Sequence, residues 1–102
     1  MRVIKLKTLR FFWQRHPETE PALLRIYRVL AQTPFHDWAE MRRTFPDADA
    51  VKARSGRTVT VFNVGKTGYR LLAAIHYNRQ MCFILKVMPH KEYERGDWRD
   101  LL

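Results

Sequence analysis

The chain has 102 residues, 46% of them apolar, which is enough for one modest hydrophobic core and too many for global disorder. Nineteen Lys and Arg residues against ten Asp and Glu give a formal net charge of +9, which predicts an anionic partner, nucleic acid above all. No apolar run approaches the roughly 20 residues that span a bilayer, and the basic start of the chain lacks the apolar stretch of a secretory signal. We therefore expect a single cytoplasmic domain, residues 1–102, without membrane contact.

The first third of the chain is expected to form a short strand and two helices. Residues 1–4 are a strand candidate for an edge or a central position. Apolar residues then recur at helical spacing over residues 5–16, and Pro17 should end that helix. A second amphipathic helix begins at Pro21, a favoured first-turn residue, and breaks at residues 33–34. The two helices should form a helical hairpin.

A third, shorter helix is followed by strand-forming sequence. Asp37 with Glu40 three residues later has the spacing of a capping box, which predicts a helix start. Residues 50–53 are a weak strand candidate, residues 55–57 a turn, and residues 58–63 are strongly β-forming.

Two strands in the second half decide the arrangement of charges. A hairpin loop at residues 65–68 precedes strands over residues 69–77 and 81–88, joined by a predicted three-residue turn at 78–80. In that register odd-numbered residues pair with odd-numbered residues and form one apolar face for the helices to cover. The opposite face would carry the even-numbered residues, which are Arg70, Leu72, Ala74, His76, Cys82, Ile84, Lys86 and Met88.

Arg70 and Lys86 are diagonal neighbours on that second face. Two adjacent cations repel each other, so the pair costs stability unless an anion lies between them. This placement predicts a binding site for a polyanion, at the end of the sheet where His90 follows in the sequence.

A cluster of ionisable residues directly follows the last strand. His90 and Tyr93 share one face of a helical turn, and Lys91 lies between them. A metal-free ribonuclease needs groups that move protons, cations at the phosphate and a surface that holds bases, and these residue types supply them. The plain alternatives are a surface histidine, a core tyrosine and solvated charges, and the spacing alone does not separate them.

Other chemistries find little support in the sequence. The Gly65-Lys66-Thr67 triplet lacks the upstream glycine and the following helix of a nucleotide-binding loop, so we interpret it as part of the hairpin. One cysteine, Cys82, and four scattered histidines make no zinc-binding spacing, and Cys82 is expected to be a buried apolar residue. We expect neither a metal nor a cofactor.

Two segments resemble the HigB family of bacterial toxins: VFNVGKTGYRLLAAIHY (residues 61–77) and VMPHKEYERGDW (residues 87–98). In that family a Phe-Asn-(Val/Ile)-Gly turn leads into a Tyr-Arg-Leu strand, and a Thr-His-Lys-Glu-Tyr-Asp segment closes the domain. The chain differs from this pattern at Lys66, Pro89 and Glu94, where glycine, threonine and aspartate are common. The resemblance extends over essentially the whole chain.

The resemblance implies an α+β, compact RelE-like domain, with N-terminal helices packed on one face of a small, mainly antiparallel sheet. It implies a type II toxin that cleaves mRNA on the ribosome without a metal and is inhibited by a HigA-type antitoxin. DNA contact is expected only through the antitoxin complex. We assign Arg70 and Lys86 to phosphate stabilisation, and His90 and Tyr93 to proton transfer or base stacking.

We also assign Lys66 and Lys91 to RNA contacts. Asn63, at the mouth of the predicted hairpin, is a candidate to read or orient a base or the sugar. An alternative is a non-catalytic RNA- or ribosome-binding protein that blocks translation without cutting the message. A direct DNA-binding role is disfavoured, because no helix-turn-helix pattern with a basic recognition helix is present.

Overall fold

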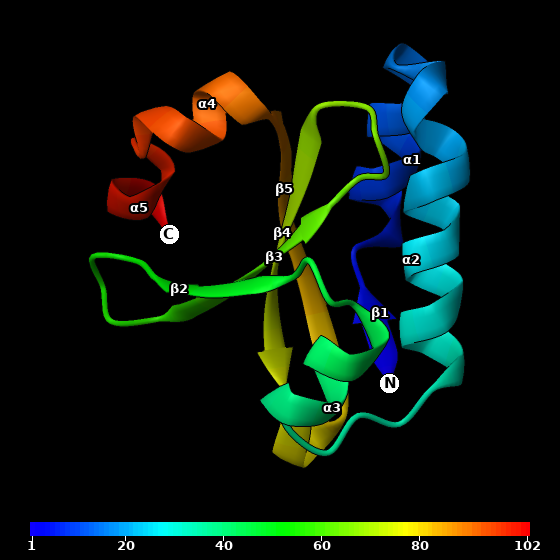
Figure 1. Ribbon diagram of the computed structural model, residues 1–102, viewed down its shortest axis with the longest axis vertical. Helices are drawn as coiled ribbons and strands as arrows, with labels where there is room; N and C mark the ends of the chain where they lie inside the picture. The colour runs from blue at the N-terminus through cyan, green and yellow to red at the C-terminus, as the bar shows by residue number, and fades with distance from the viewer.

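The computed structural model describes residues 1–102, which form a five-stranded sheet with helices on both faces (Figure 1). In chain order the elements are β1 (Arg2–Ile4), α1 (Leu6–Arg15), a 3₁₀ turn (Pro17–Thr19), α2 (Glu20–Gln32), α3 (Trp38–Thr44), β2 (Asp49–Lys52), β3 (Thr58–Asn63), β4 (Tyr69–His76), a second 3₁₀ turn (Tyr77–Arg79), β5 (Met81–Pro89), α4 (His90–Arg95) and α5 (Trp98–Leu101). None of the helices is long and apolar enough to cross a membrane.

The strand order is β1-β5-β4-β3-β2, in which β1 runs parallel to β5 and every other pair is antiparallel. Helices α1 and α2 lie together on one face of the sheet (Figure 1). This confirms the predicted α+β class, with N-terminal helices on a mainly antiparallel sheet. The strand predicted at the start of the chain is an edge strand.

The helix boundaries follow the local signals. The Asp37 Oδ1 atom accepts the Glu40 backbone N–H at 2.9 Å, which confirms the predicted N-cap of α3. The Glu40 carboxylate accepts the backbone N–H of His36 at 3.2 Å, one residue before the cap, so the capping box is only half formed. Helix α2 begins one residue earlier than expected, at Glu20, and Pro21 lies in its first turn.

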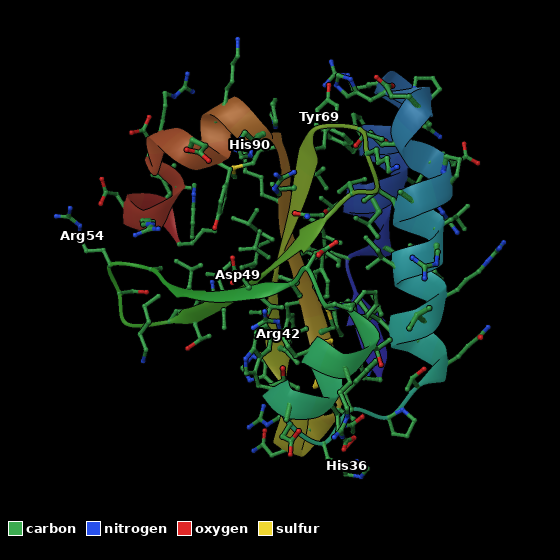
Figure 2. All side chains as sticks on the ribbon, in the orientation of Figure 1. His36, Arg42, Asp49, Arg54, Tyr69 and His90 are labelled. Carbon is green, nitrogen blue, oxygen red and sulfur yellow. The ribbon has the colours of Figure 1, made fainter.

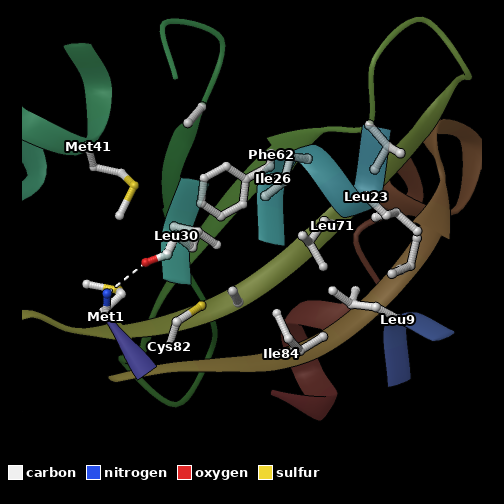
Figure 3. Packing of buried hydrophobic residues seen from close by; sticks show 14 of the residues in the cluster. Met1, Leu9, Leu23, Ile26, Leu30, Met41, Phe62, Leu71, Cys82 and Ile84 are labelled. Carbon is white, nitrogen blue, oxygen red and sulfur yellow. Dashed lines mark hydrogen bonds between the residues drawn. The ribbon is translucent and has the colours of Figure 1, made fainter. Parts of the chain in front are cut away.

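The larger hydrophobic cluster lies between the helices and the sheet. Leu23, Ile26 and Leu30 of α2 are buried against Phe62 and Leu71 (Figure 3). The ammonium group of Met1 donates hydrogen bonds to the carbonyl groups of Leu30, at 2.7 Å, and of Thr33, at 3.0 Å. These carbonyls lie at the C-terminus of α2 and have no partner within the helix, so the contact ties β1 to the end of α2.

The predicted pairing of β4 with β5 is wrong over half of its length. The connection has four residues rather than three, so His76 pairs with Met81, and even-numbered residues of β4 face odd-numbered residues of β5. Gln80 allows this turn: its φ is +53°, and its Nε2 atom donates to the carbonyls of Phe35, at 2.6 Å, and Tyr77, at 2.8 Å.

A β-bulge restores the predicted register further along β5. Leu72 pairs with Lys86 and Ala73 pairs with Ile84, so Leu85 is the extra residue. Cys82 and Ile84 therefore lie in the core beneath the helices, not on the opposite face as expected. Met81 and Phe83, the partners of His76 and Ala74, take that opposite face instead.

The opposite face of the sheet carries a second hydrophobic cluster, which the sequence analysis did not anticipate. Trp98, 3% exposed, packs there against apolar residues of β3, β4 and β5. The C-terminal segment forms α4 and α5 over this face (Figure 1), and the carboxylate of Asp100 pairs with Arg54 beside the β2–β3 turn at 2.7 Å. The sheet is therefore covered on both sides, and α4 holds the ionisable cluster against the ends of β4 and β5.

Candidate functional site

Helix α4 begins where β5 ends, and backbone contacts fix its position. Pro89 adopts an extended conformation as the N-cap, and the His90 backbone N–H donates to the carbonyl of Gly68 at 2.8 Å. Gly68 belongs to the β3–β4 loop and has a φ of +83°, a value that favours glycine. Gly96, with a φ of +79°, ends α4. The loop and α4 thus lie beside the first residues of β4, which include Arg70.

Arg70, His90 and Glu94 form a continuous hydrogen-bonded chain. The Arg70 guanidinium donates from Nη2 to His90 Nδ1 at 2.9 Å, and from Nη1 to the Tyr69 carbonyl at 3.1 Å. Because guanidinium groups only donate, Nδ1 of His90 is the acceptor, and the ring proton is on Nε2. His90 Nε2 lies 3.0 Å from Glu94 Oε1, one helical turn later, and donates to it. His90 is on α4 near the end of β5 (Figure 2).

Lys86 lies beside this chain. Leu72 pairs with Lys86 and Arg70 pairs with Met88, so Arg70 and Lys86 are diagonal neighbours on one face, as predicted. Each cation already has a partner on α4, because Lys86 Nζ donates to Glu92 Oε1 at 3.0 Å while Arg70 donates to His90. These contacts offset the repulsion between the two cations in the absence of a bound anion.

Tyr93 has a core environment on one side and faces charges on the other. Its ring stacks on Trp98, with centroids 5.5 Å apart and an interplanar angle of 12°, so the ring agrees with the alternative of a core tyrosine. Burial raises the pKa of Tyr93, and the negative charge of Asp49 raises it further, while Arg99 and Arg70 lower it. The phenol is therefore protonated at neutral pH and able to donate a proton or a hydrogen bond.

The three residues predicted to contact RNA are not equally close to this cluster. Asn63 is exposed and pairs with Arg70 across β3 and β4, so it lies directly beside the cluster. Lys91 is exposed on α4. Lys66 lies in the β3–β4 loop and lines a cavity of about 540 Å³ against α2. Asn63 lines the same cavity, so it connects this cavity with the cluster.

The structure brings together the four residues expected to act on phosphate, which are Arg70, Lys86, His90 and Tyr93. It adds three carboxylates that the sequence analysis did not assign to the site: Glu92 and Glu94 on α4, and Asp49 on β2. Asp49 is labelled in Figure 2. The contact of His90 with Glu94 could have been predicted from the sequence, because residues four positions apart lie on the same face of a helix. Asp49 had no such signal, because it reaches the cluster only through strand pairing.

The site is a set of cations and proton-transfer groups gathered where β4 begins and α4 follows β5. Arg70 and Lys86 supply positive charge, His90 supplies a ring nitrogen that is neutral in this hydrogen-bond pattern, and Tyr93 supplies a protonated hydroxyl. Such a set suits a phosphodiester.

Comparison with known proteins agrees with this chemistry. Residues 19–96 match the model of HigB_toxin, described as the RelE-like toxic component of a toxin-antitoxin system. The "mRNA interferase toxin HigB" of Escherichia coli K12 is 30% identical over 94 residues, which cover 92% of this chain and 88% of that protein. The "mRNA interferase HigB" of Escherichia coli O6:H1 is 32% identical over 82 residues, which cover 80% of this chain and 78% of the relative. The chain therefore belongs to the HigB family of RelE-like toxins, the toxic components of toxin–antitoxin systems.

Proposed function

We propose that the protein is an mRNA interferase, a metal-independent endoribonuclease that cuts mRNA on the ribosome and thereby stops translation and growth. The observation that carries the proposal is the contact of Arg70 with His90, beside Lys86, at the rim of the sheet. Both relatives are named as mRNA interferases, which supports the same activity. The net charge of +9 supports an RNA substrate.

The proposed reaction uses the 2′-hydroxyl of the RNA as the nucleophile. The 2′-oxygen attacks phosphorus and the bond from phosphorus to the 5′-oxygen breaks. The leaving 5′-oxygen takes a proton from the Tyr93 hydroxyl or from His90 once it carries the 2′-hydroxyl proton, and the products are a 2′,3′-cyclic phosphate and a 5′-hydroxyl. Arg70 and Lys86 stabilise the charge that develops on the phosphate oxygens. A phosphate bound to Arg70 takes over its N–H donors and releases Nδ1 of His90, which then accepts the 2′-hydroxyl proton.

Tyr93 is protonated at neutral pH, because its pKa is raised, so it acts as a proton donor or a stacking surface and not as a base. Asn63 is exposed and pairs with Arg70, and Lys91 is exposed next to His90 on α4, so both contact nucleotides that flank the cut. Lys66 contributes through a more distant part of the RNA, beside α2.

The partners follow from the family. A HigA-type antitoxin is proposed to hold the toxin inactive and to provide whatever DNA contact the complex makes. Ribosome-bound mRNA is the substrate, which places the activity in the cytoplasm.

The decisive experiment is primer extension on a short mRNA in a purified translation reaction, with and without the protein, and again without ribosomes. New discrete 3′ ends that require ribosomes are the expected result. Stalled translation on intact message would show a non-catalytic inhibitor and would overturn the assignments of Arg70, Lys86, His90 and Tyr93. Cleavage of equal efficiency without ribosomes would remove only the ribosome requirement.

A further inference from the structure

One edge of the sheet is open along most of β5. Strand β1 pairs with β5 only at Met81, Cys82 and Phe83. Lys5, which has a φ of +72°, then turns the chain away from the sheet into α1. Beyond Phe83 no strand lies on this side of β5, because β5 has β4 as its only other neighbour. The outward-facing backbone groups of that stretch are free to pair with another strand.

A groove of about 590 Å³ follows this open edge, between α1 and β5. Four of its nine lining residues are apolar, among them Phe11, Leu85 and Val87, and four are cationic, among them Lys5, Lys7 and Lys86. None is acidic. Phe11 is 60% exposed, an unusual position for a phenylalanine, and only the guanidinium of Arg15, at 5.9 Å from the ring centroid, covers it.

We propose that this groove binds an extended acidic segment of a protein partner, which adds to the sheet as a strand beside β5. Main-chain N–H and C=O groups of the segment pair with the edge of β5, and this pairing supplies affinity without a particular sequence. Apolar side chains of the segment pack on Phe11 and Leu85, and carboxylates face Lys5 and Lys7. A nucleic acid matches the positive charge, but it offers no regular main-chain donors to a strand edge.

The groove and the candidate catalytic site share Lys86. Its Nζ atom donates to Glu92 at 3.0 Å, and the same residue lines the groove. A carboxylate in the groove competes with Glu92 for this cation and removes it from the phosphate. Occupancy of the groove by such a segment therefore lowers cleavage. This last step rests on the proposed function, whereas binding of the segment does not.

The test of binding uses four probes and no activity measurement. The first is a synthetic peptide of about eight residues, a usual strand length, with alternating Glu and Leu. The others are its Gln and Leu counterpart, the acidic peptide with alternate amide nitrogens methylated, and an oligouridine of similar length. Each is titrated into the isotope-labelled protein, and amide chemical shifts and hydrogen exchange are followed at residues 84–88.

The acidic peptide is expected to shift and protect these amides, while the glutamine and methylated peptides bind at least about tenfold more weakly, a difference of about 1.4 kcal/mol. The double variant K7E/F11S, on exposed positions of α1, is expected to lose binding. The control R28E, on α2, makes a comparable charge change outside the groove and is expected to bind normally.

No binding of the acidic peptide, equal binding of the methylated peptide, or binding that K7E/F11S leaves unchanged would overturn the proposal. So would protection of the β5 edge by oligouridine alone, which would assign the groove to RNA. If the peptide fails but ribosome-dependent cleavage persists, only the groove assignment falls. If the peptide binds but no cleavage is found, the proposed enzymatic function falls and the docking surface remains.

Discussion

The guanidinium of Arg70 lies 2.9 Å from the Nδ1 atom of His90, so the free protein holds its candidate base in a hydrogen bond with its candidate phosphate ligand. A ring nitrogen that accepts a hydrogen bond from a cation is a poor proton acceptor. A phosphate that binds Arg70 breaks this contact and makes Nδ1 available. In the proposed mechanism, binding of the substrate and activation of the base are thus linked through the Arg70 side chain.

Arg70→Ala is therefore expected to lower the rate of ribosome-dependent cleavage by about 10²- to 10³-fold, the usual loss when one charge-stabilising donor is removed. Arg70→Lys keeps the charge but loses the paired donors, so it should recover only part of the rate. Single-turnover cleavage followed by primer extension measures both. Unchanged cleavage by a folded Arg70→Ala protein would exclude the residue from the site.

His90→Ala combined with Tyr93→Phe is expected to abolish toxicity and leave the fold intact. His90 is exposed, and the phenylalanine keeps the ring that stacks on Trp98, so the packing beneath α4 is preserved. Growth after induction and far-UV circular dichroism check the two parts of the expectation. Full toxicity from the folded double variant would remove both residues from the mechanism.

Glu94→Gln tests whether the carboxylate 3.0 Å from His90 Nε2 orients the ring. The amide can present either an acceptor or a donor to His90, so we expect cleavage at saturating substrate to fall about tenfold. Apparent affinity should change little, because Glu94 does not contact the phosphate cations. Glu94→Asp, the residue common in the family at this position, should restore most of the rate. A loss confined to affinity would argue against an orienting role.

Trp98→Ala is expected to destabilise the fold by about 3–5 kcal/mol, the range for removal of a large buried aromatic side chain. Trp98 is 3% exposed, and its Nε1 atom donates to the carbonyl of Tyr93 at 3.1 Å. Urea denaturation measures the loss. Leu101→Ala is the control, since Leu101 lies on the same short helix and is 79% exposed. Similar midpoints for the two variants would contradict the assignment of Trp98 to a second core.

Tyr77→Phe is expected to stabilise the protein by about 1 kcal/mol at neutral pH, since the Tyr77 hydroxyl is buried without a hydrogen-bond partner. Burial raises the pKa of Tyr77 to about 12 from its usual 10. In the unfolded chain the phenol ionises first, so the folded protein loses stability as pH rises from 10 to 12.

The variant should therefore lose stability less steeply over that range in urea titrations at several pH values. Some loss should remain and should begin at lower pH, because burial also raises the pKa of Cys82, from 9.0 to about 12. A Tyr77→Phe protein with an unchanged alkaline slope would show that the hydroxyl ionises in the folded state as it does in water.

The sequence by itself determined the features that depend on neighbouring residues. The periodicity of residues 5–16, the cap at Asp37 and the β-forming run of residues 58–63 specified elements that the structure contains. The diagonal placement of Arg70 and Lys86 matches the prediction only because two departures cancel: the turn is one residue longer than expected, and the bulge at Leu85 moves the pairing back by one residue before Lys86. The family followed from two short segments of sequence.

Only the tertiary structure decided the faces of β5 and the contacts of α4. One extra residue, Leu85, reverses the side-chain alternation, and no local signal marks it, so Cys82 and Ile84 were assigned to the wrong face. The contact of Arg70 with His90 joins residues 20 positions apart. It exists because Trp98 anchors the C-terminal helices on the second face of the sheet. Burial of distant apolar groups, which periodicity does not encode, set these positions.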